Sequence, residues 1–337
     1  MDPAVTVAEL LTTTESLLVV CHDNPDPDCL ASALALEHIA YSVGVDDVTI
    51  VYGGTISHQQ NRAMVDRLAI DVEHAAGLEP PADCIAFVDH SRAGGASAIA
   101  PSVEPDLIVD HHPGEHLGAP VMDVRTDYGS TATIMVEYLE VLRIRPTARV
   151  ATALLFALHR ERLDFIRRPT RREYEAALSV YPNADIEELE HLYGSAFTPA
   201  TIDAIGTAIT SRTRRGAVVA AGTGRTSETD ALPQAAEYLL NLDGVDTVLT
   251  YGLVGEEIRL SARSIDSEVN VGERIQDAFG DLGDVGGHPD MAGGFLPANR
   301  VFEEVGRTPE EPALDAVGPH LESRFFEAVR AGEWPTT

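Results

Sequence analysis

Acidic residues and histidines gather at three points of this sequence, each directly after a short apolar run. Mixed carboxylates and imidazoles suit borderline-hard divalent ions such as Mn²⁺, Mg²⁺ or Co²⁺. Two such ions, roughly 3.5–4 Å apart, can activate a water and hold the oxygens of a phosphoryl group. The clusters supply enough ligands for such a centre: His22, Asp26, Asp28, Asp89, His90, Asp110, His111 and His112.

A single aspartate or histidine after a strand is more often a helix cap or a hydrogen-bonded loop residue than a metal ligand. Three clusters of ionisable residues at the ends of three apolar runs are better explained by a single cause, and a shared metal centre is such a cause. The cysteines do not indicate a metal site of their own, because Cys21, Cys29 and Cys84 show no CxxC spacing. We interpret them as small buried apolar residues.

Short apolar runs alternate with helical patterns in the first half of the chain, which predicts βαβ units and a parallel sheet. The carboxyl ends of parallel strands meet at one edge, where open α/β folds place their sites. Ser130 is a plausible cap for a helix that runs through Leu142, and the free N–H groups at its start would favour an anion. The expected strands lie at 17–21, 48–52, 85–88 and 107–109, and the expected helices between them at 30–41 and 59–69.

These clusters resemble the motifs of the DHH phosphoesterases, a family named for a triplet that stands here as Asp110-His111-His112. Most of the chain takes part in the resemblance, and within the family it is most similar to the group containing nano-RNases, which also remove the 3′-phosphate from phosphoadenosine phosphate. The matching segments are residues 22–32, 89–90, 110–112, 129–134 and, for the glycine-rich signature of the DHH-associated C-terminal domain, 286–293.

The resemblance implies a role for each ligand. One metal ion would be held by His22 and Asp26, and the other by Asp28 and His111. Asp89 would bridge the two ions, as a carboxylate with two oxygens can. The implied cofactor is a pair of divalent ions, with Mn²⁺ expected first and Mg²⁺ or Co²⁺ as alternatives.

The resemblance also implies that His112 faces the scissile phosphate. A final bridging aspartate is expected near residues 157–162, but Glu161 stands at that position. Glu161 could bridge through its longer side chain, or Asp164 could serve instead, or Glu161 could be a solvated or arginine-paired acid.

Near the other end, Arg263 resembles the arginine with which the family grips a substrate phosphate. Gly286 and Gly287 would let a ligand approach the backbone, because glycine has no Cβ, and His288 follows them. Met291 stands where the family usually has alanine, so the shape of the nucleotide pocket is expected to differ. On its own, this segment would be a turn with a surface histidine.

The chain has 24 basic residues, all of them arginine, against 54 acidic ones, and its net charge is −30. In dilute salt the acidic side chains repel one another and also repel RNA. At 1 M salt the Debye length is only about 3 Å, so most of this repulsion is screened. We therefore expect a halophilic protein. An acidic mesophilic protein or a binder of basic partners are the alternatives.

Residues 143–172 form a basic exception, with nine arginines and two acids, a balance of +7. Arg168 and Arg172 follow the last expected ligand, so their guanidinium groups could bind a phosphate-bearing substrate as it enters. The alternative is a set of surface ion pairs. At Ser130, too, either a phosphate contact or a simple helix start is possible.

The expected fold is α/β, with a parallel-sheet catalytic domain at residues 1–195, a smaller mixed α/β substrate-binding domain at 205–337, and the active-site cleft between them. A chain of 337 residues is long enough for two domains. No targeting segment and no run of 18 apolar residues is evident, so we expect a soluble, cytoplasmic protein.

The expected activity is a metal-dependent phosphodiesterase that degrades very short RNAs or dinucleotides to mononucleotides, with phosphatase action on phosphoadenosine phosphate as a possible companion. Within the same chemistry, hydrolysis of cyclic di-AMP or its linear product, and RecJ-like single-strand exonuclease action, are alternatives. A pyrophosphatase is disfavoured by the GGH signature. Outside catalysis, a nucleotide-binding regulator that has lost activity is the remaining alternative. The sequence does not indicate the oligomeric state.

Overall fold

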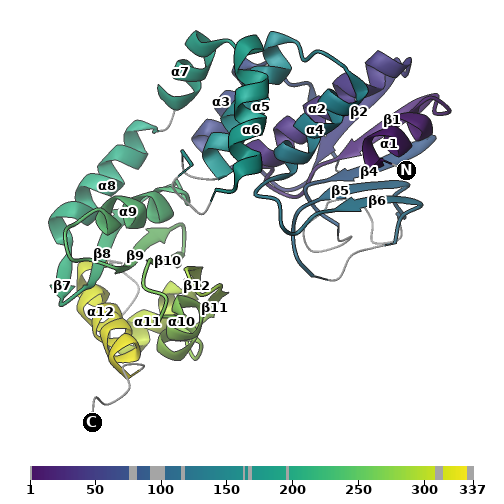
Figure 1. Cartoon of the computed structure of the whole chain (residues 1–337). Coiled ribbons are helices and arrows are strands. Elements are labelled where there is room, and N and C mark those ends of the chain that lie inside the picture. Colours follow the sequence, from purple (N-terminus) through teal and green to yellow (C-terminus); the bar gives the residue numbers. More distant parts are fainter. Residues whose placement is uncertain are drawn as a thin grey trace. The chain divides into compact units, whose positions relative to one another are not determined.

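The computed structural model describes residues 2–75, 82–91, 103–114, 118–161, 164–165, 169–194, 197–307 and 314–331. The chain divides into two compact units, residues 1–196 and 197–337, each described here by itself (Figure 1). Of the residues expected at a site, Arg168 lies outside the described residues.

The first unit contains a parallel sheet, as the alternation of apolar runs and helical patterns predicts. In the described part of this unit the strand order is β3-β2-β1-β4-β5-β6, and every neighbouring pair is parallel. The direction in which the chain adds strands reverses between β1 and β4, the place where open α/β sheets bind ligands. The strands are β1 (Ser16–Val20), β2 (Asp47–Tyr52), β3 (Val72–His74), β4 (Cys84–Val88), β5 (Leu107–Asp110) and β6 (Val121–Val124).

Helices cover one face of this sheet in a large core, and α2 packs against both α4 and α5 (Figure 1). Leu17 and Val19 of β1 join this core, whereas Leu18 and Val20 point to a smaller cluster on the opposite face. This alternation follows from the period of two along a strand. The helices are α1 (Pro3–Leu11), α2 (Pro27–Val43), α3 (Gln59–Arg67), α4 (Thr131–Leu142), α5 (Ala148–Glu161), α6 (Arg171–Val180), the 3-10 turn η1 (Tyr181–Asn183) and α7 (Ile186–Gly194).

The ends of α2 follow from its sequence. Asp26 accepts hydrogen bonds from the N–H groups of Asp28 and Cys29, and Pro27 occupies the first helical position, where its missing N–H costs nothing. The helix ends at Gly44, whose φ of 100° suits glycine. Residues of the first acidic cluster therefore also start the most buried helix of the unit.

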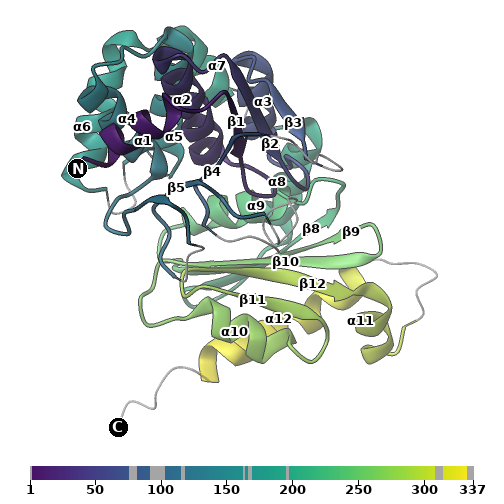
Figure 2. The same ribbon diagram turned by 90° about the vertical axis from the view of Figure 1, so that its right-hand side faces the viewer.

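The second unit is a mixed sheet with helices on both faces, as Figure 2 shows. Its strand order in the described residues is β11-β12-β10-β9-β8-β7, with β8 and β9 parallel and the other pairs antiparallel. The elements are α8 (Pro199–Ser211), β7 (Thr213–Arg215), β8 (Val218–Arg225), α9 (Ala231–Leu240), β9 (Thr247–Val254), β10 (Glu257–Ser264), α10 (Val271–Phe279), β11 (Asp284–Gly287), β12 (Met291–Pro297), α11 (Ala298–Glu304) and α12 (Leu314–Ala331).

Candidate metal centre

Three neighbouring strands of the first sheet carry the acidic and histidine clusters at their carboxyl ends. His22 follows β1, Asp89 directly follows β4, and His111 directly follows β5. Because β4 lies between β1 and β5, Asp89 falls between the two histidines. The structure thus brings together residues that are far apart in sequence.

Asp89 lies at the middle of the cluster. Its Oδ2 is 3.8 Å from Nε2 of His22, and its Oδ1 is 3.6 Å from Nε2 of His111. The hydroxyl of Thr131 donates a hydrogen bond of 2.7 Å to Oδ1. The backbone of Asp89 has a φ of 61°, in the left-handed region that aspartate tolerates better than most residues. The two carboxylate oxygens therefore face different histidines.

Asp28 lies on the His111 side of the cluster. Its Oδ2 is 3.6 Å from Nε2 of His111. The backbone N–H groups of Thr131 and Ala132 donate hydrogen bonds of 2.8 and 2.7 Å to its two oxygens. The positive end of α4 thus holds the carboxylate of Asp28.

Ser130 caps α4, and the helix runs to Leu142, so the predicted helix is confirmed. The Ser130 hydroxyl is fully buried and accepts the N–H of Thr133 at 3.1 Å. At the start of this helix, Asp28 takes the N–H groups that we expected to favour an external anion. A substrate contact at Ser130 stays a prediction.

Asp26 reaches the His22 side of the cluster. Its Oδ1 accepts the two N–H groups that start α2 and lies 4.0 Å from Nε2 of His22. The Asp26 side chain is 43% exposed, in contrast to the buried Asp28 and Asp89. It is the ligand candidate most accessible to solvent among these carboxylates.

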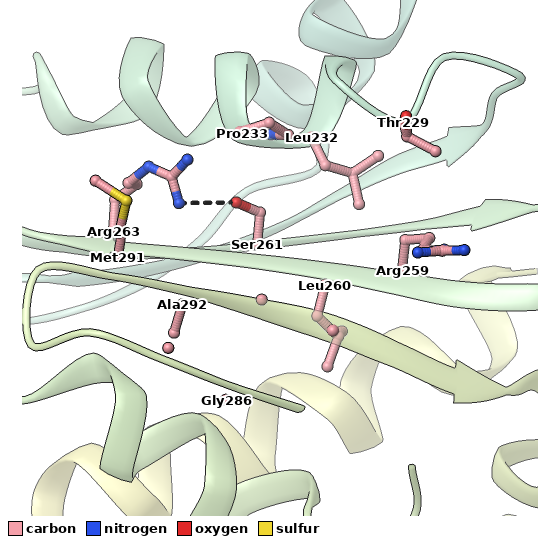
Figure 3. Close-up of a pocket in the computed structure, with 13 residues that line it drawn as sticks. Thr229, Leu232, Pro233, Arg259, Leu260, Ser261, Arg263, Gly286, Met291 and Ala292 are labelled. Carbon is pink, nitrogen blue, oxygen red and sulfur yellow. Dashed lines mark hydrogen bonds between the residues drawn. The ribbon is translucent and has the colours of Figure 1, made fainter. Parts of the chain in front are cut away.

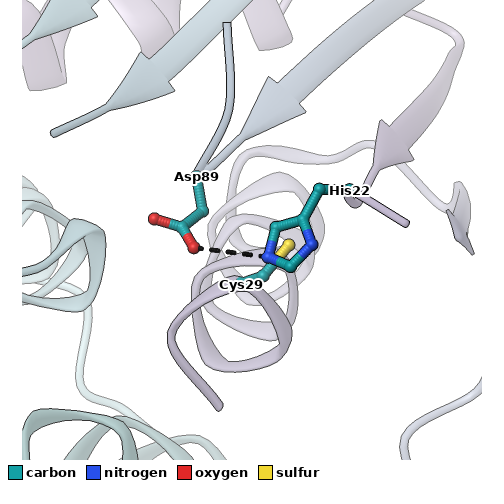
Figure 4. Close-up of side chains that lie close together, drawn as sticks. All are labelled: His22, Cys29 and Asp89. Carbon is teal, nitrogen blue, oxygen red and sulfur yellow. Dashed lines mark ion pairs between the residues drawn. The ribbon is translucent and has the colours of Figure 1, made fainter. Parts of the chain in front are cut away.

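A buried thiol also lies here. Cys29 Sγ, a ring nitrogen of His22 and a carboxylate oxygen of Asp89 all lie within 4.8 Å of one another (Figure 4). The sulfur is 3.5 Å from the carbonyl oxygen of Val88, to which the thiol can donate. The interpretation of the three cysteines as buried agrees with the structure, but that interpretation overlooked this position of Cys29.

The electrostatics of the cluster favour a cation. Burial raises the pKa of both Asp28 and Asp89, and the charge of Asp28 raises that of Asp89 further. Burial alone would lower the pKa of His22, but Cys29 and Asp26 raise it to about 10. Without a metal ion, protons on the buried carboxylates and on His22 thus offset part of the negative charge of the cluster.

The distances fit a metal ion. The contacts between histidine nitrogens and Asp28 or Asp89 oxygens, 3.6 to 3.8 Å, are too long for hydrogen bonds. Two ligand atoms that each lie about 2.0–2.2 Å from one ion are separated by such distances. Imidazole nitrogen and carboxylate oxygen are also the donors that Mn²⁺, Co²⁺ and Zn²⁺ accept. The residues present therefore fit a metal centre.

His112 differs from His111 in its surroundings. Its Nδ1 lies 2.8 Å from Oδ1 of Asp110, which also accepts the N–H groups of both histidines. This hydrogen bond raises the pKa of His112, and the ring remains 55% exposed. His111 is instead oriented by the carbonyl oxygen of Tyr128, 3.3 Å from its Nδ1, which fixes Nδ1 as the donor. His112 is thus available to a substrate, and His111 presents Nε2 to the cluster.

The substitution at the expected last ligand has a structural setting. Glu161 is the final residue of α5, and its charge contributes to the raised pKa of His112. Asp164, the alternative ligand, accepts a hydrogen bond of 2.5 Å from the Tyr193 hydroxyl and lies 3.4 Å from Nδ1 of His159. Asp164 therefore belongs to a different group of side chains. Metal binding by Glu161 stays a prediction.

Arg172 forms an ion pair. Its Nη1 lies 3.0 Å from Oδ2 of Asp127, and its guanidinium group lies over the Tyr128 ring, 4.6 Å from the ring centre. This is the surface pairing that we considered as the alternative to substrate binding. A role in substrate binding stays a prediction for Arg172.

The second unit contains a pocket of about 370 Å³ on β10, β12 and the start of α9 (Figure 3). Arg263, Gly286 and Gly287 line it, whereas His288 is not among its lining residues. Nη1 of Arg263 donates hydrogen bonds of 3.2 Å to the Ser261 hydroxyl and 3.0 Å to the Ala262 carbonyl. The arginine thus has a defined position at the pocket.

The two glycines of the pocket have different reasons to be glycine. A Cβ on Gly286 would meet no atom within 4 Å. A Cβ on Gly287, whose φ is 157°, would lie 2.5 Å from the carbonyl oxygen of Met291. His288 donates its N–H to the same carbonyl at 2.7 Å and so closes the β11–β12 hairpin. Gly287 is needed for packing, whereas a ligand contact at Gly286 stays a prediction.

Comparisons with known proteins agree with this architecture. Residues 16–158 match the DHH family, N-terminal domain, and residues 215–308 match the DHHA1 domain. An uncharacterized protein of Methanocaldococcus jannaschii is 35% identical over 315 residues, which are 93% of this chain and 64% of that protein. The chain thus spans less than two thirds of the length of this relative.

Among solved structures, an exopolyphosphatase-related protein from Bacteroides fragilis has a TM-score of 0.75 at 13% identity, with 97% of each chain covered. RecJ from Thermus thermophilus, crystallised in complex with Mn²⁺, has a TM-score of 0.54 at 13% identity, with 99% of this chain and 55% of RecJ covered. At these identities the likeness shows the fold.

The described residues thus form a parallel α/β unit, with possible metal ligands at the switch point of its sheet, and a mixed α/β unit that follows it along the chain. The chain carries an N-terminal domain of the DHH family, followed by a DHHA1 domain. Along the described part of the chain, no helix combines the length and the apolar character that crossing a membrane requires.

Proposed function

We propose that this protein is a phosphodiesterase that uses two divalent ions to hydrolyse very short RNA oligonucleotides to mononucleotides. Removal of the 3′-phosphate from phosphoadenosine phosphate is proposed as a companion activity. Mn²⁺ is the proposed ion, with Mg²⁺ or Co²⁺ as substitutes. The structure of RecJ with Mn²⁺ is one precedent for that ion in the same fold.

The observation that carries the proposal is the position of Asp89. Its two oxygens face two different histidines, His22 and His111, at 3.8 and 3.6 Å. A carboxylate that binds a single ion needs a histidine ligand beside only one of its oxygens. A carboxylate that bridges two ions needs a further ligand beside each oxygen. We therefore assign His22 and Asp26 to one ion and Asp28 and His111 to the other, with Asp89 shared.

When bound, the two ions would lower the pKa of a water and polarise the phosphate oxygens. The residues of the chain have separate tasks. Thr131 holds Oδ1 of Asp89 in place through its hydroxyl, and the start of α4 holds Asp28. His112, more than half exposed and hydrogen-bonded to Asp110, is assigned to a non-bridging oxygen of the scissile phosphate.

Substrate selection is assigned to the pocket of the second unit. Its 370 Å³ is at the lower end of the range for small-ligand sites, about 300–1,000 Å³, which suits one nucleotide better than a long strand. Arg263 supplies a guanidinium group for a phosphate, the geometry for which arginine is preferred. A terminal nucleotide is the proposed ligand of this pocket.

The test uses the purified protein in molar KCl with Mn²⁺ and end-labelled RNAs of increasing length. Dinucleotides should be converted to mononucleotides faster than longer strands. Asp89→Asn should lose turnover, and the matched control Asp46→Asn, an exposed residue before β2, should keep it. Wild-type protein that binds Mn²⁺ and nucleotides without hydrolysing any of them would reject the enzyme in favour of a binding regulator.

The same panel separates the related substrates. Cyclic di-AMP, its linear product and phosphoadenosine phosphate are assayed beside the RNAs at equal concentration. Faster hydrolysis of long single strands than of dinucleotides would favour an exonuclease of the RecJ kind and would contradict the proposed length preference.

A further inference from the structure

Cys29 is the one sulfur within the described ligand cluster, and the two ion positions therefore differ in chemistry. On one side, the Cys29 thiol joins His22 and Asp89 within 4.8 Å (Figure 4). On the other side, Asp28 and His111 offer oxygen and nitrogen. This difference does not depend on any substrate.

The fold places the thiol there for local reasons. Cys29 lies in the first turn of α2, where its N–H donates to the capping Asp26 at 3.0 Å. The same turn directs its sulfur to the end of β4, 3.5 Å from the carbonyl oxygen of Val88. Val88 directly precedes Asp89, and His22 follows β1, the strand that pairs with β4. The sulfur is thus held between the two strands that flank the switch point.

The burial of Cys29 excludes the usual surface roles of a thiol. Its exposed fraction is 0%, and two metal-type ligands lie beside it. A small apolar residue would fill the same volume, but it could not coordinate an ion. Thiolate favours softer ions, whereas carboxylate and imidazole also accept Mn²⁺ and Mg²⁺.

We propose that Cys29 is a sulfur ligand of the His22 ion position, which then prefers a thiophilic ion such as Zn²⁺ or Cd²⁺ and also accepts Co²⁺, a borderline ion. The position at Asp28 and His111 keeps a harder ion. On binding, the thiol releases its proton to solvent and the sulfur forms one bond to the ion, with no change of oxidation state. The inference rests on the metal centre of the proposed function, but not on hydrolysis.

The test follows Co²⁺ binding by absorption, because a sulfur ligand produces a charge-transfer band in the near ultraviolet that nitrogen and oxygen ligands lack. The wild-type protein should show this band. Cys29→Ser should lose it and still bind Co²⁺, as followed by the visible ligand-field bands. Cys84→Ser is the matched control, because Cys84 is equally buried but lies at the start of β4, and it should keep the charge-transfer band.

X-ray absorption at the cobalt edge of the wild-type protein provides a measurement that needs no variant to fold. A sulfur shell at about 2.3 Å is expected beside the nitrogen and oxygen shell at about 2.0–2.2 Å. Bound Co²⁺ without a sulfur shell, or a band that survives in Cys29→Ser, would overturn the inference.

The outcomes also separate this inference from the proposed function. Hydrolysis of dinucleotides without a sulfur ligand leaves the proposed function standing and removes the role of Cys29. A sulfur ligand without hydrolysis of any phosphoester confirms the role of Cys29 and rejects the proposed function. Failure of the wild-type protein to bind any divalent ion overturns both.

Discussion

Asp28 and Asp89 are two carboxyl groups buried beside each other, and burial raises the pKa of both. In an unfolded chain the pKa of aspartate is about 3.9. Without metal, the folded protein therefore binds more protons than the unfolded chain above that pH. Its stability falls as the pH rises through this window, because both buried groups are forced to ionise.

A divalent ion that replaces these protons should reverse this loss. We predict that the increase in Tm on adding Mn²⁺ is larger at pH 8 than at pH 5, because protons compete with the ion at the lower pH. Thermal unfolding at both pH values measures it. In Asp89→Asn the dependence on pH should be smaller. An increase in Tm that is equal at both pH values would show that these carboxylates do not couple to the ion.

The residues of the site were predictable to different degrees. The aspartates and histidines stand out because each cluster follows an apolar run, and the resemblance to a family assigns roles to them. Thr131 and Cys29 are less visible. A threonine in a helix start and a cysteine among apolar residues are common, and only the fold reveals their distance from Asp89.

Glu173 links two elements beside the site. It is fully buried on α6, and its carboxylate accepts the N–H of Gly129, at 2.8 Å, and that of Thr170, at 2.5 Å. It thereby fixes the turn that precedes α4 and caps its own helix. The position of α4, which holds Asp28, thus depends on a residue outside the metal cluster.

We predict that Glu173→Ala lowers the free energy of unfolding by about 3 kcal/mol, because a buried N–H group of Gly129 and a partly buried one of Thr170 lose their acceptor, at about 1–3 kcal/mol for each unsatisfied group. Urea denaturation measures it. Glu175→Ala is the matched control on the same helix, since its ion pair with Arg171 is exposed and should change stability by less than about 1 kcal/mol. Equal losses in both variants would contradict the assigned role of Glu173.

At the level of elements, the long and strongly patterned segments were predictable. The parallel sheet, α4 and its cap are confirmed. β3 has only three residues and β6 is partly exposed, so neither carries a clear apolar pattern. The β11–β12 hairpin is rich in glycine, which weakens any strand signal, and its register depends on contacts with β10 and α10.

The whole molecule carries a net charge of −30 without any lysine. Salt shortens the range of this repulsion, from about 10 Å at 0.1 M to about 3 Å at 1 M. Composition alone indicates this dependence, since the acids are dispersed along the chain. It does not indicate which positions face solvent.

We predict that Tm rises between 0.1 and 2 M KCl, by about 2–4 °C for each kcal/mol of relieved repulsion. Thermal unfolding in a KCl series measures it. A variant with five exposed acids changed to amides should depend less on salt, and a salt dependence equal to that of the wild type would contradict charge repulsion as the cause. Those acids are Glu9, Asp46, Glu140, Glu190 and Asp243.

The hydrogen bonds between Asp28 and the start of α4 span 103 and 104 residues of the chain. A ribosome adds about 5–20 residues per second, so the partners of Asp28 are made roughly 5–20 s after Asp28 itself. During that interval the nascent first half cannot form its complete ion site. The nascent chain should therefore gain its affinity for metal abruptly, once Ala132 has left the exit tunnel.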